Sequence, residues 1–213
     1  MLNNLRLILE PYLIKLGSFF SKFGLSPNFW TFLGLIIAIF SAVAFSFGSS
    51  FPESLDSPNL YYPIIGGFLL LIAGFFDIVD GAVARYQNVS NNKGKFLDST
   101  IDRVSEIIIF VGIFLGSYGN FDNICSCVNY PNIFNLLLIL SLSFSFLVSY
   151  LSSIAKNLSI NLTGIGLGER AERILILAIL SIFGLIEIAI IVILVMSIIT
   201  FIHRFIYVFK KLS

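Results

Sequence analysis

Long apolar segments, separated by short polar stretches, follow one another along most of this chain. A helix needs about 20 apolar residues to cross the roughly 30 Å hydrocarbon core of a membrane. Six segments approach that length and are predicted to be transmembrane helices: 28–47, 61–85, 95–115, 133–156, 170–185 and 187–207. Only Gly184 and Glu187 mark a turn between the last two. One bent helix is the alternative there, although it would be too long for a single crossing.

The N-terminal segment has a different pattern, in which apolar residues alternate with the charged residues Arg6, Glu10, Lys15 and Lys22. This pattern is typical of an amphipathic helix that lies in the membrane interface, and Pro11 either kinks it or starts it. A weakly hydrophobic extra span is the alternative, which the charges disfavour. We therefore predict a single all-α domain over residues 1–213, with an interfacial helix in 1–24 and a bundle of six transmembrane helices in 25–213.

Composition and charge support a membrane protein. Hydrophobic residues make up 57% of the chain and the mean hydropathy is +0.97, values that exclude an ordinary soluble domain. The net charge of +1 gives no reason to expect nucleic acid as a partner. With six spans, all 13 Lys and Arg residues fall on or toward one face, whereas the loops 48–60 and 119–132 hold none. The positive-inside rule therefore places both termini on the cytoplasmic side of the cell membrane.

Four aspartates interrupt this apolar pattern: Asp77, Asp80, Asp98 and Asp102. An Asp at the centre of a membrane helix costs roughly 2.5–3.5 kcal/mol on insertion scales, so the set requires compensation. Two nearby arginines, Arg85 and Arg103, cannot neutralise four carboxylates, whereas bound divalent cations could. Oxygen-only ligands favour hard cations such as Mg²⁺ or Mn²⁺, with Ca²⁺ as a further option. A buried salt-bridge cluster is the alternative, which is disfavoured because the acids outnumber their basic partners.

The spacing of these aspartates predicts that they meet. The first two are three residues apart and the last two are four apart, so each pair shares one helical face. Residues 86–94 between the pairs are polar and turn-rich, which indicates the hinge of an antiparallel helical hairpin. Folding about that hinge brings Asp77 level with Asp102 and Asp80 level with Asp98. The site then lies at the cytoplasmic end of the two helices.

The same region resembles a known family. The pattern D-x2-D-G-x2-A-R-x8-G-x3-D-x3-D is the signature of the CDP-alcohol phosphotransferases, and this chain matches it without a gap at Asp77, Asp80, Gly81, Ala84, Arg85, Gly94, Asp98 and Asp102. The resemblance implies that Asp77, Asp80 and Asp98 are the main ligands of two Mg²⁺ or Mn²⁺ ions. It also implies that Asp102, which lies within reach of a metal, is the general base. Homodimerisation is a further implication of the family.

Other residues of the pattern are assigned to the CDP-lipid by the same resemblance. In the family, the arginine that corresponds to Arg85 lies at the nucleotide diphosphate. Ser26, Pro27, Asn28 and Thr31 resemble a P-N-x-x-T segment that opens the first span near the nucleotide. A helix start explains Ser26 as an N-cap and Pro27 at the first helical position, which leaves Asn28 and Thr31 as candidates. The predicted CDP-lipid set is therefore Asn28, Thr31, Gly81, Ala84, Arg85 and Gly94.

A second basic group suggests the acceptor. Arg170 and Arg173 are three residues apart on one helical face and resemble the G-x-x-x-R-x-x-R region of family members that use inositol phosphate. A phosphorylated acceptor needs cations beyond the metal site, and guanidinium groups suit it. Membrane anchoring is the alternative for this pair, whereas charge balance for the carboxylates is the alternative for Arg103. The predicted acceptor-phosphate set is Arg103, Lys156, Arg170 and Arg173.

The resulting hypothesis is a membrane transferase. It moves a diacylglycerol or archaeol phosphate group from a CDP-lipid to inositol 1-phosphate and releases CMP. Glycerol 3-phosphate or serine as the acceptor is the alternative within the family, and a divalent-cation transporter is the alternative of another class. Cys125 and Cys127, in a predicted non-cytoplasmic loop, are interpreted as two free thiols.

Overall fold

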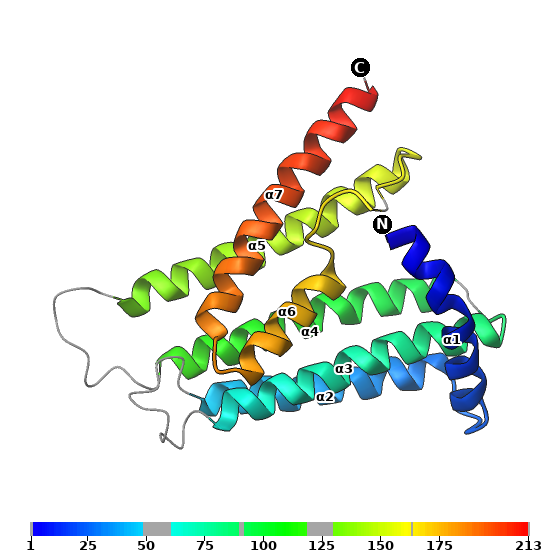
Figure 1. Ribbon diagram of the computed structural model, residues 1–213, viewed down its shortest axis with the longest axis horizontal. Helices are drawn as coiled ribbons and strands as arrows, with labels where there is room; N and C mark the ends of the chain where they lie inside the picture. Colours follow the sequence, from blue (N-terminus) through cyan, green and yellow to red (C-terminus); the bar gives the residue numbers. More distant parts are fainter. Residues whose placement is uncertain (1, 49–60, 90–91, 119–129, 163, 213) are drawn as a thin grey trace.

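The computed structural model describes residues 2–48, 61–89, 92–118, 130–162 and 164–212. All regular secondary structure in these ranges is helical, which confirms the predicted all-α class. The helices are α1 (Leu2–Ser21), α2 (Pro27–Phe47), α3 (Tyr61–Tyr86), α4 (Asn92–Tyr118), α5 (Tyr130–Asn157), α6 (Arg170–Ile182) and α7 (Ile186–Leu212) (Figure 1). Cys125 and Cys127 lie outside the described residues.

Four of the described helices, α2, α3, α5 and α7, are long and apolar enough to cross a membrane. The two other predicted spans correspond to α4 and α6, neither of which is both long and apolar enough to cross a membrane by the same measure. Helix α4 has 27 residues, but its first 15 residues carry several charged side chains, among them Asp98, Asp102 and Glu106. Helix α6 has only 13 residues, which is about 20 Å at a rise of about 1.5 Å per residue and so less than a full crossing.

The turn between α6 and α7 settles the alternative of one bent helix. Helix α6 ends at Ile182, and α7 runs in the opposite direction from Ile186 (Figure 1). Gly184 adopts φ +72°, the left-handed conformation that glycine reaches without steric cost. Its backbone N–H donates to the Ser181 carbonyl, which closes the helix end. Two separate helices are therefore correct, as the position of Gly184 predicts.

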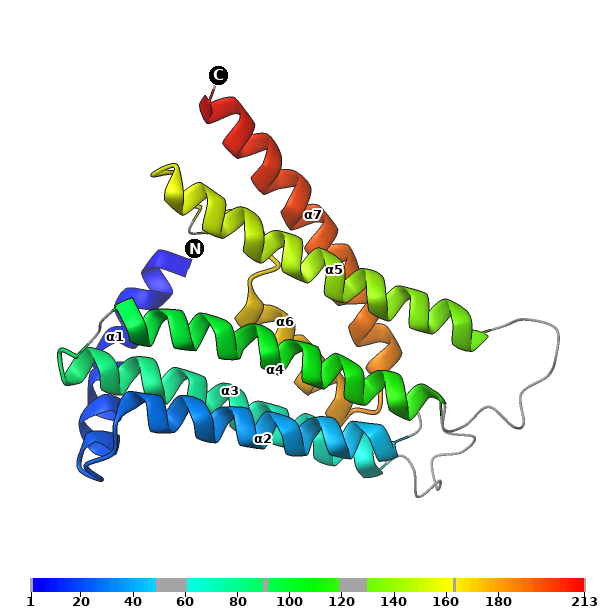
Figure 2. The same ribbon diagram turned by 180° about the vertical axis from the view of Figure 1, so that it is seen from behind.

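Helices α2, α3 and α4 run side by side, and α2 packs against both of its neighbours (Figures 1 and 2). Small residues allow the close approach of α2 and α4. A Cβ at Gly112 would collide with the Ala42 backbone, and one at Gly116 with the Phe45 carbonyl. Such contacts are typical of helix pairs in membranes, where van der Waals packing rather than the hydrophobic effect holds helices together.

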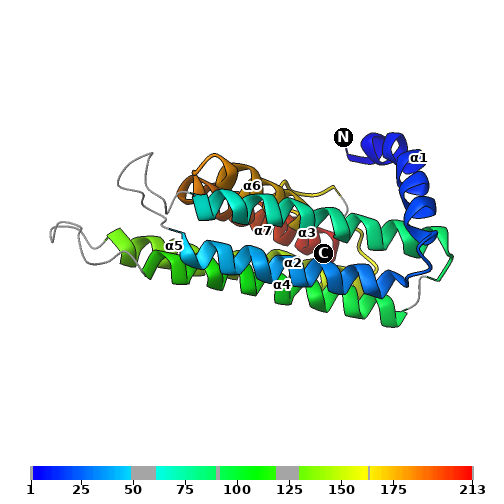
Figure 3. The same cartoon turned by 90° about the horizontal axis from the view of Figure 1, so that it is seen from below.

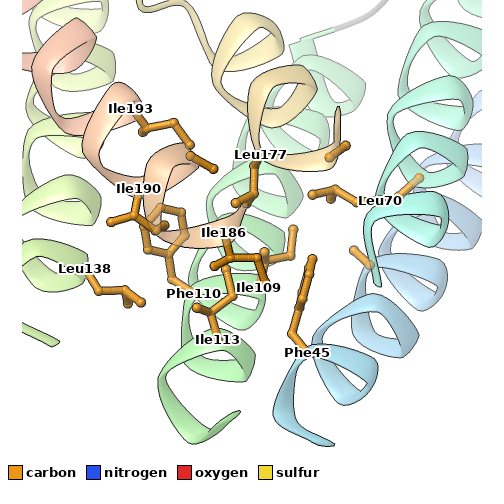
Figure 4. Close-up of a cluster of buried hydrophobic side chains, with 14 of the residues drawn as sticks. Phe45, Leu70, Ile109, Phe110, Ile113, Leu138, Leu177, Ile186, Ile190 and Ile193 are labelled. Carbon is orange, nitrogen blue, oxygen red and sulfur yellow. The ribbon is translucent and has the colours of Figure 1, made fainter. Parts of the chain in front are cut away.

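A buried apolar cluster ties six helices together at one end of the bundle. Figure 4 shows its members converging from α2, α3, α4, α6 and α7, and Leu138 belongs to the cluster from α5. The central side chains are Phe45, Leu70, Ile109, Ile113, Leu177 and Ile190. They lie toward the end where α2 ends and α3 begins. The four aspartates lie on the other halves of α3 and α4, so the packed core leaves that end for polar chemistry.

Helix α1 crosses the end of the bundle where α2 begins and α3 ends (Figure 3). It runs through Pro11 rather than starting there. A Cβ at Gly17 would collide with the Ala82 carbonyl of α3, so α1 and α3 approach closely there. The Phe20 ring contacts Trp30, which stacks on Phe76 at a centroid distance of 5.7 Å. These aromatic contacts fix α1 against α2 and α3 next to the aspartate end.

Candidate active site

Three carboxylates converge from two helices. Asp77 of α3 and Asp98 and Asp102 of α4 each offer an oxygen atom, and these atoms all lie within 4.8 Å of one another. The antiparallel course of α3 and α4 produces this meeting, as the hairpin prediction requires (Figure 2). A cluster made only of carboxylate oxygens matches the ligand preference of a hard divalent cation.

Asp80 lies one turn beyond Asp77 and is only 6% exposed. The Thr31 side chain and the Gly81 backbone lie beside its carboxylate. Its Oδ2 atom is buried and has no hydrogen-bond partner among the residues that the structure describes. A buried carboxylate oxygen without a partner is costly, and a bound cation would satisfy it. The donor set of these four aspartates therefore fits a divalent metal ion.

Arg170 enters the same carboxylate cluster from the first turn of α6. Its Nη1 atom lies 3.1 Å from Asp77 Oδ1 and 2.6 Å from Asp102 Oδ1, and Nη2 lies 3.4 Å from the Ser105 hydroxyl. The sequence analysis assigns Arg170 to the acceptor-phosphate site. In the structure, however, Arg170 directly contacts Asp77 and Asp102, two of the predicted metal ligands.

The connection from α5 to α6 explains how Arg170 reaches this depth. After α5, the chain turns back toward the middle of the bundle before α6 begins (Figure 1). Arg204 of α7 anchors this connection, because Nε lies 2.7 Å from the Ile165 carbonyl and Nη2 lies 3.1 Å from Glu169 Oε1. Glu169 in turn caps α6 in a reciprocal capping box with Glu172. Sequence reasoning missed Arg204 and Glu169, because Glu is not among the residues usually found at an N-cap.

Arg173 lies in a different environment from Arg170. Its side chain is 2% exposed and contacts Glu106 of α4, which is 1% exposed, with Nη2 2.9 Å from Oε1. Glu106 also accepts a hydrogen bond from Arg103 Nη1 at 3.2 Å. This geometry gives no support to a direct contact between Arg173 and an acceptor phosphate. Sequence reasoning missed Glu106, although it follows Asp102 by four residues and so shares its helical face.

A cavity of about 320 Å³ adjoins the aspartates and is lined by α2, α3, α4 and α6. Its polar lining residues are Thr31, Asp77, Asp80, Asp102, Ser105 and Arg170. Most of the remaining lining is apolar, with residues such as Leu35, Ala38, Leu70, Ile109 and Ile174. The volume is in the range of small-molecule sites. A cavity with both kinds of lining suits a ligand that joins a charged group to hydrocarbon.

The other predicted residues lie farther from this cavity. Asn28 is exposed at the start of α2, and Lys156 is exposed at the end of α5. Ala84 and Gly94 are half-buried on α3 and in the first turn of α4. Arg85 is exposed and borders a smaller cavity that Glu10 and Tyr86 also line, between α1 and α3. Among the predicted CDP-lipid residues, Thr31 is the one that lines the larger cavity.

Comparison with known proteins identifies the family. Residues 25–208 match the family model for CDP-alcohol phosphatidyltransferases. This chain belongs to the CDP-alcohol phosphatidyltransferase family. Its aspartate pattern thus predicted the family correctly, and the protein is a CDP-alcohol phosphotransferase that resides in a membrane.

Relatives of this CDP-alcohol phosphatidyltransferase cover nearly its whole length. The archaetidylinositol phosphate synthase of Pyrococcus horikoshii is 32% identical over 211 residues, covering 99% of this chain and 97% of that protein. That of Methanothermobacter thermautotrophicus is 31% identical over 219 residues, covering 100% and 96%. The phosphatidylinositol phosphate synthase of Mycobacterium tuberculosis, solved in complex with manganese and citrate, has the same fold. Its TM-score is 0.70 at 22% identity, with 91% of this chain and 87% of that chain covered.

Proposed function

We propose that this enzyme transfers the lipid phosphate group of a CDP-lipid to inositol 1-phosphate and releases CMP. The observation that carries this proposal is the cavity between α2, α3, α4 and α6, which is lined both by three of the aspartates and by apolar residues. A CDP-lipid likewise combines a charged diphosphate with hydrocarbon. The two archaeal relatives, which are named for an inositol phosphate lipid, support the choice of acceptor.

The metal site proposed here consists of Asp77, Asp80, Asp98 and Asp102, holding two Mg²⁺ or Mn²⁺ ions. When bound, such ions polarise the diphosphate and neutralise the charge of the departing CMP. The buried Oδ2 atom of Asp80 and the convergence of the other three carboxylates support this assignment.

The chain's own residues position the reactants and move one proton. The acceptor hydroxyl attacks the phosphorus that bears the lipid, so a new P–O ester bond forms while the P–O bond to CMP breaks. Asp102 takes the proton of that hydroxyl. Arg170 binds the acceptor phosphate through charge-assisted hydrogen bonds. Its Nη1 atom lies 2.6 Å from Asp102 Oδ1, which supports a position for that phosphate near the base. Arg103 and Lys156 add positive charge on the route of the acceptor, and Arg173 acts through its contact with Glu106.

The diphosphate of the CDP-lipid is held beside the aspartates. Thr31 lies beside Asp80. Gly81 lies next to the guanidinium of Arg85, since a Cβ added at Gly81 would be in van der Waals contact with that group. Asn28, Ala84 and Gly94 complete the predicted nucleotide side. The apolar lining accepts the lipid chains, either ester-linked diacylglycerol or ether-linked archaeol.

The membrane arrangement proposed here keeps six helices in the bundle. The chain returns toward the middle of the bundle before α6 begins, so the 13 residues of α6 need to cross only the rest of the membrane. Helix α4 is also a membrane crossing, with Asp98 and Asp102 facing the site rather than lipid. Helix α1 lies in the cytoplasmic interface, both termini and the active site face the cytoplasm, and the enzyme is a homodimer.

An acceptor screen tests the function. Purified protein is given a CDP-lipid labelled in its lipid part, in ester and ether versions, together with inositol 1-phosphate, glycerol 3-phosphate, serine or inositol. Inositol 1-phosphate is expected to support the fastest formation of labelled product and equimolar CMP. Faster turnover with glycerol 3-phosphate, serine or free inositol would overturn the choice of acceptor. Metal flux into liposomes without any CMP release would favour the transporter instead.

A further inference from the structure

Arg170 occupies an unusual position for a residue that binds a substrate phosphate. A single nitrogen atom, Nη1, contacts the carboxylates of both Asp77 and Asp102. Both carboxylates belong to the group that converges within 4.8 Å together with Asp98. The guanidinium and a divalent ion are therefore two cations that compete for the same pair of carboxylates, and they repel each other strongly at this short distance.

The surroundings leave the side chain of Arg170 as the part that can move. Its backbone starts α6 behind the Glu169 cap, and Arg204 ties Glu169 to α7. The side chain is 21% exposed and lines the cavity, so space lies next to it. Its Nε atom is buried and has no hydrogen-bond partner within the described part of the chain. The present contacts thus leave one of its donors unused.

We propose that Arg170 and the divalent ion exchange places at Asp77 and Asp102. The guanidinium is the internal counter-ion that stabilises the acidic cluster, and binding of the ion displaces it into the cavity. This inference rests on the metal site of the proposed function. Displacing Arg170 makes the free energy of metal binding less favourable. Since the ion must break two charge-assisted contacts, Arg170 lowers the apparent affinity of the wild-type protein for metal.

Direct metal binding without any substrate tests the exchange. The dissociation constant of Mn²⁺ is measured by electron paramagnetic resonance of the free ion, with purified wild-type protein and Arg170→Gln. Arg170→Gln is expected to bind Mn²⁺ about ten- to hundred-fold more tightly, the range of charged hydrogen bonds. Arg170→Lys, which keeps the charge but loses the planar fork, is expected to lie between the two. Equal or weaker binding by Arg170→Gln would overturn the exchange.

Arg103→Gln is the matched control for simple charge removal. Arg103 also lies near the aspartates, but it hydrogen bonds to Glu106 rather than to Asp77 or Asp102. Its removal is expected to change the Mn²⁺ dissociation constant by less than about threefold, since a partly exposed charge is well screened. If Arg103→Gln tightens binding as much as Arg170→Gln does, general electrostatics explains the effect and the exchange is wrong.

Thermal unfolding gives a second, independent measurement. In metal-free buffer, Arg170→Gln is expected to unfold at a lower temperature than wild type, because its carboxylates lack their counter-ion. Saturating Mn²⁺ is expected to raise the unfolding temperature of Arg170→Gln more than that of wild type. An equal rise in both proteins contradicts the exchange. A failure of the metal site itself is distinguishable, because Mn²⁺ would then bind Asp77→Asn as well as it binds wild type.

Discussion

The buried pair of Glu106 and Arg173 makes a strong prediction about stability. Arg173 donates three hydrogen bonds, two from Nε and Nη2 to Glu106 and one from Nη1 to the Gly168 carbonyl. Glu106→Leu leaves the guanidinium with only the Gly168 carbonyl, at 2% exposure. Removing one partner of a buried ion pair costs about 3–5 kcal/mol. Arg103 also loses Glu106, but at 35% side-chain exposure water replaces that contact at a cost of about 1 kcal/mol or less.

The double variant Glu106→Leu/Arg173→Met separates the pair from its surroundings. Replacing both charged partners by apolar residues of similar volume is often nearly neutral, so most of the lost stability is expected to return. The free energy of unfolding is measured in mixed micelles for wild type, both single variants, the double variant and Arg103→Gln as the exposed control. A cost below about 1 kcal/mol for Glu106→Leu, or single costs that simply add in the double variant, would refute this reasoning.

Three further predictions concern the site and the bundle. Asp102→Asn is expected to abolish transfer while CDP-lipid still binds in an equilibrium assay; loss of binding together with turnover would mean that Asp102 is a ligand first. Arg170→Ala is expected to raise the KM for inositol 1-phosphate by about one to two decades and to leave that for CDP-lipid nearly unchanged, as steady-state kinetics with each substrate varied would show. An unchanged acceptor KM would remove Arg170 from the phosphate site. Gly112→Val is expected to lower the unfolding temperature by several degrees, since its side chain would meet the Ala42 backbone, and a wild-type melting curve would contradict the packing of α2 on α4.

Local spacing made the aspartate site predictable. Intervals of three and four residues place side chains on one helical face, and a polar hinge between two apolar helices leaves little freedom except an antiparallel hairpin. The convergence of Asp77, Asp98 and Asp102 is the arrangement that these two facts predict, and the packing of α2 against both helices supports it. The turn at Gly184 was predictable for a similar reason, because glycine readily takes the left-handed conformation found there.

Long-range packing decided what the sequence could not predict. The length of α6 depends on how far the chain returns after α5, and that return is fixed by contacts from Arg204 to Glu169 and Ile165. Helical periodicity placed Arg170 and Arg173 on one face, yet one contacts the aspartates and the other is buried against Glu106. The difference arises from which α4 side chain faces each turn of α6, and no local pattern carries that information.

The central claim is a metal-dependent transfer at the four aspartates, and Asp77→Asn tests it most directly. The measurement is CMP release from labelled CDP-lipid with inositol 1-phosphate, for wild type and Asp77→Asn, across a titration of Mn²⁺ and in excess chelator. Wild type is expected to require the ion and to lose turnover in chelator, while Asp77→Asn loses turnover at every metal concentration. Near-wild-type turnover of Asp77→Asn, or of wild type in excess chelator, would contradict the account.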